Sequence, residues 1–307
     1  MFKAGFLFVL SFALIVFSFI LFPKGMFVDG LTYASISSNL SEGIGTIWQP
    51  HYTQHLSPDF YGHPPLSFIL QSWFFTILGD YLWVERLYSF LTFFFKLLII
   101  KAIWNILPGK KENYWTPMIL WIICGSVFWS YSNNLIENTN ALFISGVIFF
   151  FIKSCISQQS KLLVIVGLLC FLSLLTKGPF GLFVLVTPIL YHLLFKTFPI
   201  SNLVKAYSII LLSFLTPLLF VLLLSQETQD FFQNYISQQL VNGVQNEVTV
   251  ESRWFIILRF IKNCSPILIL SSIIGFIYRK KISLNPFIFL LFLIALSGVF
   301  PVMISFK

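Results

Sequence analysis

Long apolar runs constrain this sequence more than any other feature. The first covers residues 4–23, and similar runs recur as far as residue 305. A helix that crosses a bilayer needs about 20 mostly apolar residues. Only 10% of the 307 residues are charged, whereas soluble domains carry about 25%. A water-soluble protein of this length could not cover so much apolar surface, so the sequence predicts an integral membrane protein.

The runs predict an all-α fold, a polytopic bundle of about nine membrane spans. A further apolar segment, "LSFILQSWFFTILG" at 66–79, is too short to span, and its apolar side chains recur at helical spacing on one face. We expect that segment to lie in the membrane interface. The expected spans are residues 4–23, 85–107, 115–132, 139–153, 162–176, 179–196, 205–225, 264–278 and 286–305.

The distribution of charge orients these spans. With a cytoplasmic N-terminus, the clusters Lys110-Lys111 and Arg279-Lys280-Lys281 lie inside, and nearly all acidic residues lie outside, as the positive-inside rule requires. The net charge of +8 then reflects cytoplasmic loops, and nucleic acid is not expected as a partner. Two large external loops follow, 24–84 and 226–263. The later one, the fourth external loop, contains "DFFQNYISQQLVNGV", which predicts a second interfacial helix.

Polar residues gather in the external segments. Asp29 opens an amphipathic stretch that Gly43 and Gly45 end. Its carboxylate could cap this helix by accepting a backbone N–H, could face a cavity, or could do both. His63 stands before a double proline, where a histidine is either a loop hydrogen-bonding group or a functional residue.

Two further charged residues belong to this external group. Glu137 lies in "SNNLIENTNALF", an asparagine-rich turn that either caps two helices or forms a polar cup. Lys177, in "LLTKGPFG", is one of few external lysines and is expected to meet an anion. This inventory suits chemistry on a lipid headgroup, because an acid can take a proton from an acceptor hydroxyl and cations can stabilise a departing phosphate.

The order of these motifs carries a family resemblance. "VDGLTYASISSNLSEG" is followed by "YGHPPLSFIL" and "LGDYLWVERLYS", then by "NNLIENTNALF" and "LLTKGPFGLF", and the chain ends in "PVMISFK". The arrangement resembles polytopic GT-C glycosyltransferases, namely glycosyltransferase family 39, related to protein O-mannosyltransferases, and the aminoarabinose-transferase-like bacterial proteins. The resemblance covers essentially the whole chain.

The resemblance implies an inverting enzyme of the bacterial inner membrane. It would move a sugar from a polyprenyl-phosphate donor to a lipid or cell-envelope glycan acceptor, such as lipopolysaccharide, at the external face. Membrane lipids are the other expected partners. The whole of 1–307 is expected to form one transmembrane domain that lacks the family's C-terminal helices and external domain.

The resemblance also implies roles for single residues. Asp29 matches the first-loop acid, the proposed base, and Glu137 matches a second external acid. His63, Arg86 and Lys177 match positions expected to face the donor phosphate. A divalent cation held by Asp29, Glu137 and His63 is an open alternative. The residues expected to line the substrate pocket are Tyr33, Tyr61 and Asn138.

One local departure from the family pattern stands out. Many relatives have a second acid directly after the first, whereas Gly30 follows Asp29 here. Two other functions fit the same residues: a transporter or flippase of a lipid-linked sugar, and a truncated, non-catalytic relative that binds partners.

Overall fold

In this computed structural model the chain is helical, and the described residues contain no β-strand beyond an isolated bridge between Gly45 and Pro50. The predicted all-α fold is confirmed. The structure describes residues 2–21, 25–53, 55, 58–108, 113–241, 257–258, 261–262, 265, 268–269, 272–273, 276–277 and 285–299.

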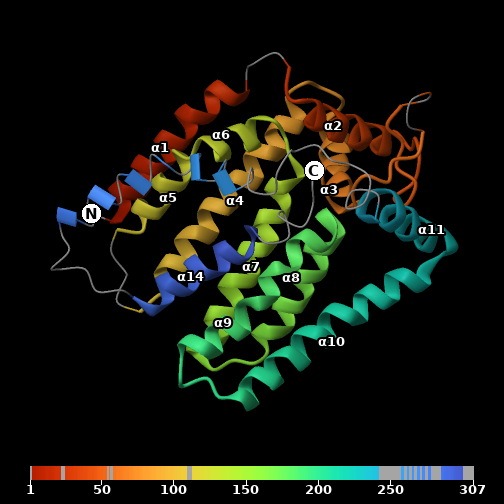
Figure 1. Ribbon diagram of the computed structural model, residues 1–307. Coiled ribbons are helices and arrows are strands. Elements are labelled where there is room, and N and C mark those ends of the chain that lie inside the picture. The colour runs from red at the N-terminus through yellow and green to blue at the C-terminus, as the bar shows by residue number, and fades with distance from the viewer. Residues whose placement is uncertain are drawn as a thin grey trace.

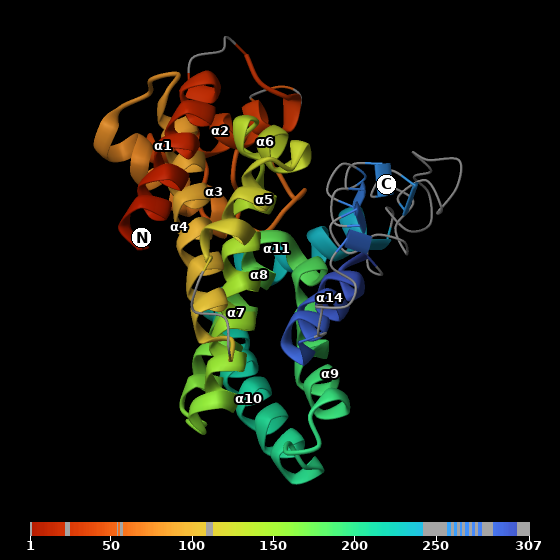
Figure 2. The ribbon, with the colours of Figure 1, turned by 90° about the vertical axis from the view of Figure 1, so that its left-hand side faces the viewer.

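The helices form an elongated bundle (Figure 1). In chain order they are α1 (Phe2–Leu21), α2 (Val28–Ser41), α3 (Leu66–Leu78), α4 (Val84–Ile106), α5 (Trp115–Ile122), α6 (Gly125–Ser132), α7 (Ile136–Ser157), α8 (Leu162–Lys177), the 3₁₀-helix η1 (Gly178–Val186), α9 (Thr187–Leu194), α10 (Ile200–Leu224), α11 (Gln226–Asn234), the π-helix η2 (Tyr235–Val241) and α14 (Pro286–Ser297). Figure 2 shows α2, α3 and α6 at one end of the molecule and the α9–α10 connection at the other.

Four helical stretches in the described residues are long and apolar enough to cross a membrane. They are Val84–Ile106, Ile136–Ser157, Leu162–Leu194 and Ile200–Leu224. The chain turns back within the third stretch at Gly178, because Lys177 lies beside Glu137 at one end of α7, whereas Tyr191 packs on Phe151 towards the other. The multi-pass character of the chain is therefore confirmed, and the count of nine spans stays a prediction.

Three expected spans differ from the structure or extend beyond the described residues. Residues 115–132 do not form one helix, because Cys124 is extended (φ −70°, ψ 116°) and separates α5 from α6. The span expected at 264–278 and both lysine clusters lie mostly or wholly outside the described residues, and the span at 286–305 is described only as far as residue 299.

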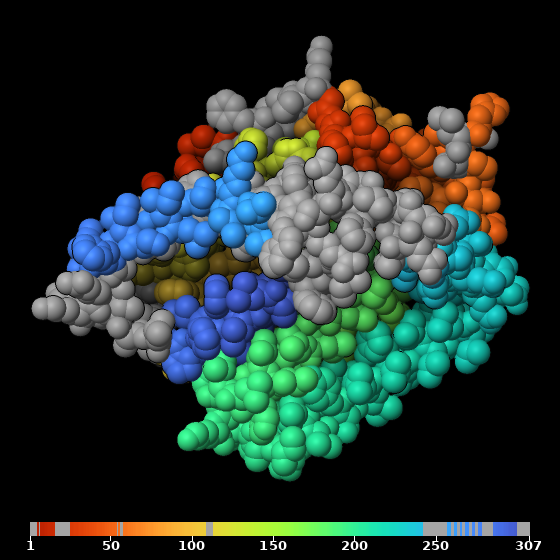
Figure 3. All heavy atoms as spheres, in the orientation of Figure 1, coloured from red at the N-terminus to blue at the C-terminus, as the bar shows by residue number. Residues whose placement is uncertain are grey.

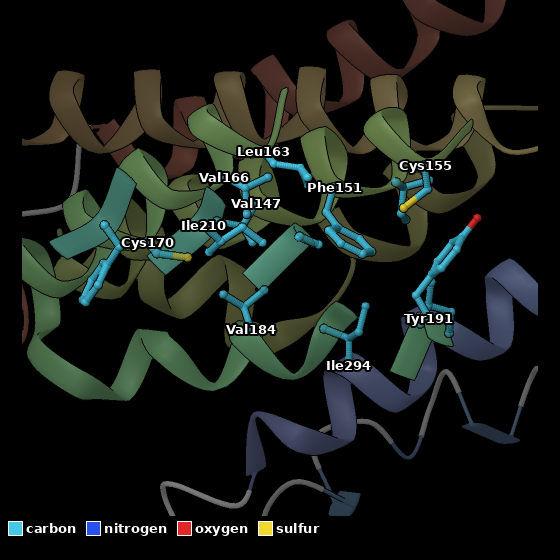
Figure 4. Close-up of a cluster of buried hydrophobic side chains, with 14 of the residues drawn as sticks. Val147, Phe151, Cys155, Leu163, Val166, Cys170, Val184, Tyr191, Ile210 and Ile294 are labelled. Atoms are coloured by element: carbon cyan, nitrogen blue, oxygen red, sulfur yellow. The ribbon is translucent and has the colours of Figure 1, made fainter. Parts of the chain in front are cut away.

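The centre of the bundle is packed from α7, α8, α9, α10 and α14. Buried side chains such as Phe151, Val166 and Ile210 meet there (Figure 4). Gly167 allows the closest approach, because a Cβ on it would lie 2.4 Å from the carbonyl oxygen of Ile210 on α10. Helices in a membrane gain little from the hydrophobic effect, so close packing of small residues is a principal source of their association.

Hydrogen bonds join α4 to α7. The Tyr88 hydroxyl lies 2.7 Å from the Thr139 hydroxyl, and Lys96 Nζ donates to the Ala141 carbonyl at 3.2 Å. The lysine also contacts Ser145. An ammonium group within an apolar span is costly unless it finds such acceptors, and these bonds fix α4 against the helix that carries Glu137.

The amphipathic segment 66–79 forms α3, but its polar side faces inward. Ser67, Gln71 and Ser72 are buried, whereas Trp73 and Ile77 are exposed. The Gln71 side chain accepts a hydrogen bond from Ser37 on α2 at 3.1 Å. Trp73 and Ile77 are thus free to face lipid, while Gln71 binds α3 to α2, and the interfacial position of the segment stays a prediction.

Exposed apolar side chains also cover α10, which lies along the outside of the bundle (Figure 3). At its end the chain enters α11 and η2, the helical segment expected in the fourth external loop. Phe231 and Tyr235 of that segment are buried, and Ile236 is exposed. The segment therefore packs against the protein through its aromatic side chains.

Candidate functional site

Three helix ends bring opposite charges together. Asp29 lies in the first turn of α2, Glu137 in the first turn of α7, and Lys177 in the last turn of α8. A helix N-terminus carries partial positive charge and a C-terminus partial negative charge. The charge of each side chain is therefore opposite in sign to the partial charge of its helix end. The fold places two acidic residues and one basic residue at the same end of the bundle.

Lys177 Nζ forms an ion pair with Oε1 of Glu137. The Glu137 side chain is 47% exposed and the Lys177 side chain 21% exposed, so a ligand can reach the pair from the protein surface. The sequence predicts that Lys177 meets an anion, and in the structure the protein itself supplies one. The pairing of these two residues was not part of that prediction.

Asp29 lies close enough to both partners to interact electrostatically. Partial burial of its carboxyl group and the nearby Glu137 carboxylate raise the pKa of Asp29, while Lys177 opposes the rise. The predicted N-cap role is wrong: the N-cap residue is Phe27, and no side chain caps the helix. The N-cap lies two residues earlier than expected, so the Asp29 oxygens do not cap the helix.

The start of α2 is fixed instead by the turn before α7. The Phe27 backbone N–H donates to Oδ1 of Asn133 at 2.6 Å. Gly30 packs so closely on the same residue that a Cβ on it would lie 1.9 Å from the Asn133 carbonyl oxygen. This contact sets how near Asp29 comes to Glu137.

Tyr33 and His63 border the charged group. Tyr33 follows Asp29 by one helical turn and is buried, and its ring makes an edge contact with the His63 ring at 5.6 Å. Burial and the charges of Glu137 and Asp29 raise the pKa of Tyr33, so its hydroxyl stays protonated. His63 acts electrostatically on Glu137. Five of the predicted site residues are therefore brought together: Asp29, Tyr33, His63, Glu137 and Lys177.

Arg86 and Asn138 lie within the helix packing beside this group. Arg86 is buried, and its guanidinium donates to the Gly25 carbonyl at 2.7 Å and to the Ser132 carbonyl at 3.5 Å. Asn138 is buried as well, and its amide bonds to Ser130 and Ser89. Both side chains hold the ends of helices in place; their predicted contacts with phosphate and substrate stay predictions.

Tyr61 lies on another side of the site, against α11. Its ring packs on Phe231 at 5.8 Å. Burial, followed by the charges of Asp59 and Asp230, raises the pKa of Tyr61. Its predicted place in a substrate pocket stays a prediction.

No metal centre is evident in the part of the chain that the structure describes. Within it, no group of three or more His, Cys, Asp or Glu side chains is placed to hold a metal ion. Asp29, Glu137 and His63 therefore do not form a ready-made set of ligands, and the lysine paired with Glu137 occupies one of the carboxylates.

The sequence did not identify η2 as part of the site. The Tyr235 hydroxyl abuts Gly178, next to Lys177, and Gln239 bonds to Gly62, next to His63. The sequence showed only that a glycine adjoins each of two candidate residues, in "KG" at 177–178 and "GH" at 62–63, where a distant side chain could pack closely. Nothing in the sequence indicated which distant side chains fill the space above them.

The four long apolar stretches and the charged group at one end of the bundle describe a polytopic helical membrane protein. The chain is similar to the crystal structure of ArnT from Cupriavidus metallidurans bound to undecaprenyl phosphate, with a TM-score of 0.76 and 13% identity over 99% of this chain and 56% of that one. It is also similar to ArnT from the same organism in the apo state, with a TM-score of 0.69 and 14% identity over 98% of this chain and 54% of that one.

These likenesses establish the fold, which is the one that the resemblance implied. The chain spans about half the length of the two ArnT chains. No family model matches the sequence, and no curated protein matches it.

Proposed function

We propose that the protein is a membrane glycosyltransferase that takes a sugar from a polyprenyl-phosphate donor. The observation that carries the proposal is the convergence of Asp29, Glu137 and Lys177 at one end of the bundle. A fold shared with a protein crystallised with undecaprenyl phosphate supports it. A transporter would more naturally place its polar groups midway along the spans.

In the proposed reaction Asp29 is the general base. Its carboxylate takes the proton of the acceptor hydroxyl, and the acceptor oxygen attacks the anomeric carbon of the donor sugar. The bond between that carbon and the phosphate oxygen breaks, and the polyprenyl phosphate leaves with the electron pair. The anomeric configuration inverts, because there is one displacement.

Lys177 and His63 are the cations proposed for the departing phosphate. An incoming phosphate competes with Glu137 for the Lys177 ammonium group, so the ion pair is expected to loosen when the donor binds. Cations held where negative charge develops in the transition state often contribute more to such catalysis than any other effect. Arg86 is proposed to organise the first loop and the turn before α7, through the carbonyls of Gly25 and Ser132.

Intact-lipid mass spectrometry of a deletion strain tests the proposal. Loss of one envelope lipid or glycan mass, restored by the wild-type gene and not by Asp29→Asn, is expected. The mass difference identifies the sugar and the acceptor together. Movement of donor across proteoliposomes without any glycoside would instead indicate a transporter, and an unchanged lipid profile would contradict the proposal.

A further inference from the structure

The π-helix η2 connects the two sides of the candidate site. One of its residues, Tyr235, lies against Gly178, and another, Gln239, bonds to Gly62. Each glycine is the immediate neighbour of a candidate phosphate residue, Lys177 or His63. The two contacts are made by side chains four residues apart, which lie on nearly the same face of a helix.

The Tyr235 contact is close and well supported. A Cβ on Gly178 would lie 1.9 Å from the Tyr235 hydroxyl, and Gly178 has a φ of +66°, which a residue with a side chain rarely adopts. Tyr235 is buried, and its ring stacks on Phe231. The tyrosine therefore fixes the backbone directly after Lys177, the last residue of α8.

The Gln239 contact acts on the first external loop. Nε2 of Gln239 donates to the Gly62 carbonyl at 3.0 Å, across 177 positions of sequence. The neighbouring Tyr61 ring packs on the same Phe231 that supports Tyr235. The loop before α3, and with it His63, is thus tied to η2.

We propose that η2 is a positioning element for the donor phosphate and that Tyr235 and Gln239 are its positioning residues. They hold the backbones beside Lys177 and His63 at a fixed separation, so that one phosphate group meets both cations. This inference rests on the proposed function. The exposure of the intervening Ile236, Ser237 and Gln238 shows that only the inward side of η2 serves this contact.

Binding of undecaprenyl phosphate to the full chain in nanodiscs tests the inference without a turnover assay. Gln239→Leu is expected to weaken binding about tenfold, in line with the loss of one hydrogen bond that orders a charged site. The matched control is Gln238→Leu on the exposed side of η2, which should leave binding unchanged. Thermal denaturation of each variant shows that the protein is folded.

A double-mutant cycle separates positioning from general stability. If Gln239 acts through His63, then Gln239→Leu should cost much less in a His63→Ala background than in the wild type. Likewise, Tyr235→Ala should cost less in a Lys177→Met background. A merely structural role predicts equal losses in both backgrounds.

Steady-state kinetics should show a lower kcat/KM for the donor in Gln239→Leu and an unchanged kcat/KM in Gln238→Leu. Equal binding by Gln239→Leu and wild type, or fully additive cycles, would overturn the inference while leaving the proposed function in place. If the wild-type chain binds no undecaprenyl phosphate, the proposed function fails, and the inference fails with it.

Discussion

Gly30 lies against the backbone of Asn133 so closely that a Cβ on Gly30 would come within 1.9 Å of the Asn133 carbonyl oxygen. The contact leaves no room for a side chain directly after Asp29. A second acid at position 30 would push α2 away from the turn that precedes α7. The first turn of α2 therefore carries one carboxylate, that of Asp29.

Gly30→Ala should destabilise the protein, although glycine to alanine within a helix ordinarily stabilises it. The new methyl group collides with backbone, and such overpacking costs about 1–3 kcal/mol. Thermal denaturation in detergent or nanodiscs measures the effect. Ser35→Ala, on the exposed side of α2, is the control and should change little. A Gly30→Ala protein as stable as wild type would contradict the contact.

Asp29→Asn should reduce transfer by roughly 10² to 10⁴, the usual contribution of a general base. Because the pKa of Asp29 is raised in the folded protein, ionisation opposes folding. The stability that the protonated carboxyl contributes is present at low pH and is lost as the pH rises through the raised pKa. At neutral pH Asp29→Asn should therefore be at least as stable as wild type.

The exposed Asp80 supplies a matched control for that variant. Asp80→Asn removes the same kind of charge by the same substitution and should leave transfer unchanged. Normal turnover by Asp29→Asn would remove Asp29 from the mechanism.

Glu137 and Lys177 should move the acid limb of the pH–rate profile in opposite directions. The Glu137 carboxylate raises the pKa of Asp29 and the Lys177 ammonium lowers it. Glu137→Gln should therefore shift the acid limb to lower pH, and Lys177→Met should shift it to higher pH. The pH dependence of the residual transfer rate measures both. Shifts of the same sign would show that the three groups do not interact as described.

Arg86→Lys should destabilise the protein although it keeps the charge. A guanidinium can donate to two carbonyls at once, whereas a lysine ammonium is a point charge on a flexible stem. Both carbonyls belong to residues that are not buried, so losing one of these hydrogen bonds costs about 0.5–1.5 kcal/mol, the net contribution of a typical hydrogen bond. A lower melting temperature is expected together with lower activity that excess donor does not restore. Unchanged stability with a raised KM alone would favour a direct contact with phosphate.

The sequence was most informative where one local rule decides the structure. Apolar runs predicted α4, α7, α8 and α10, and the glycines at 43 and 45 correctly marked the end of α2. It was least informative where two distant segments compete for one task. Asp29 has the chemistry of an N-cap, but the N-cap is Phe27, whose backbone N–H is bound by Asn133, 106 positions away in sequence.

The same limit applies to the site. The five residues that meet were all recognisable as polar residues, and all lie in or beside the segments that the sequence predicts to be external. The Lys177–Glu137 pair depends on how α7 and α8 pack, which no local pattern specifies. Arg86 and Asn138 have the same polar chemistry as the site residues, yet the fold turns them towards backbone carbonyls and neighbouring hydroxyls.

The packed face of α3 carries Ser67, Gln71 and Ser72 beside Phe68 and Phe75, while Trp73 and Ile77 are exposed. Anyone who redesigned the protein to dissolve without detergent would have to replace the outward tryptophan and isoleucine and leave the serines and glutamine untouched. A hydropathy plot alone would not distinguish these two exposed side chains from Phe68 and Phe75, which belong to the packed face.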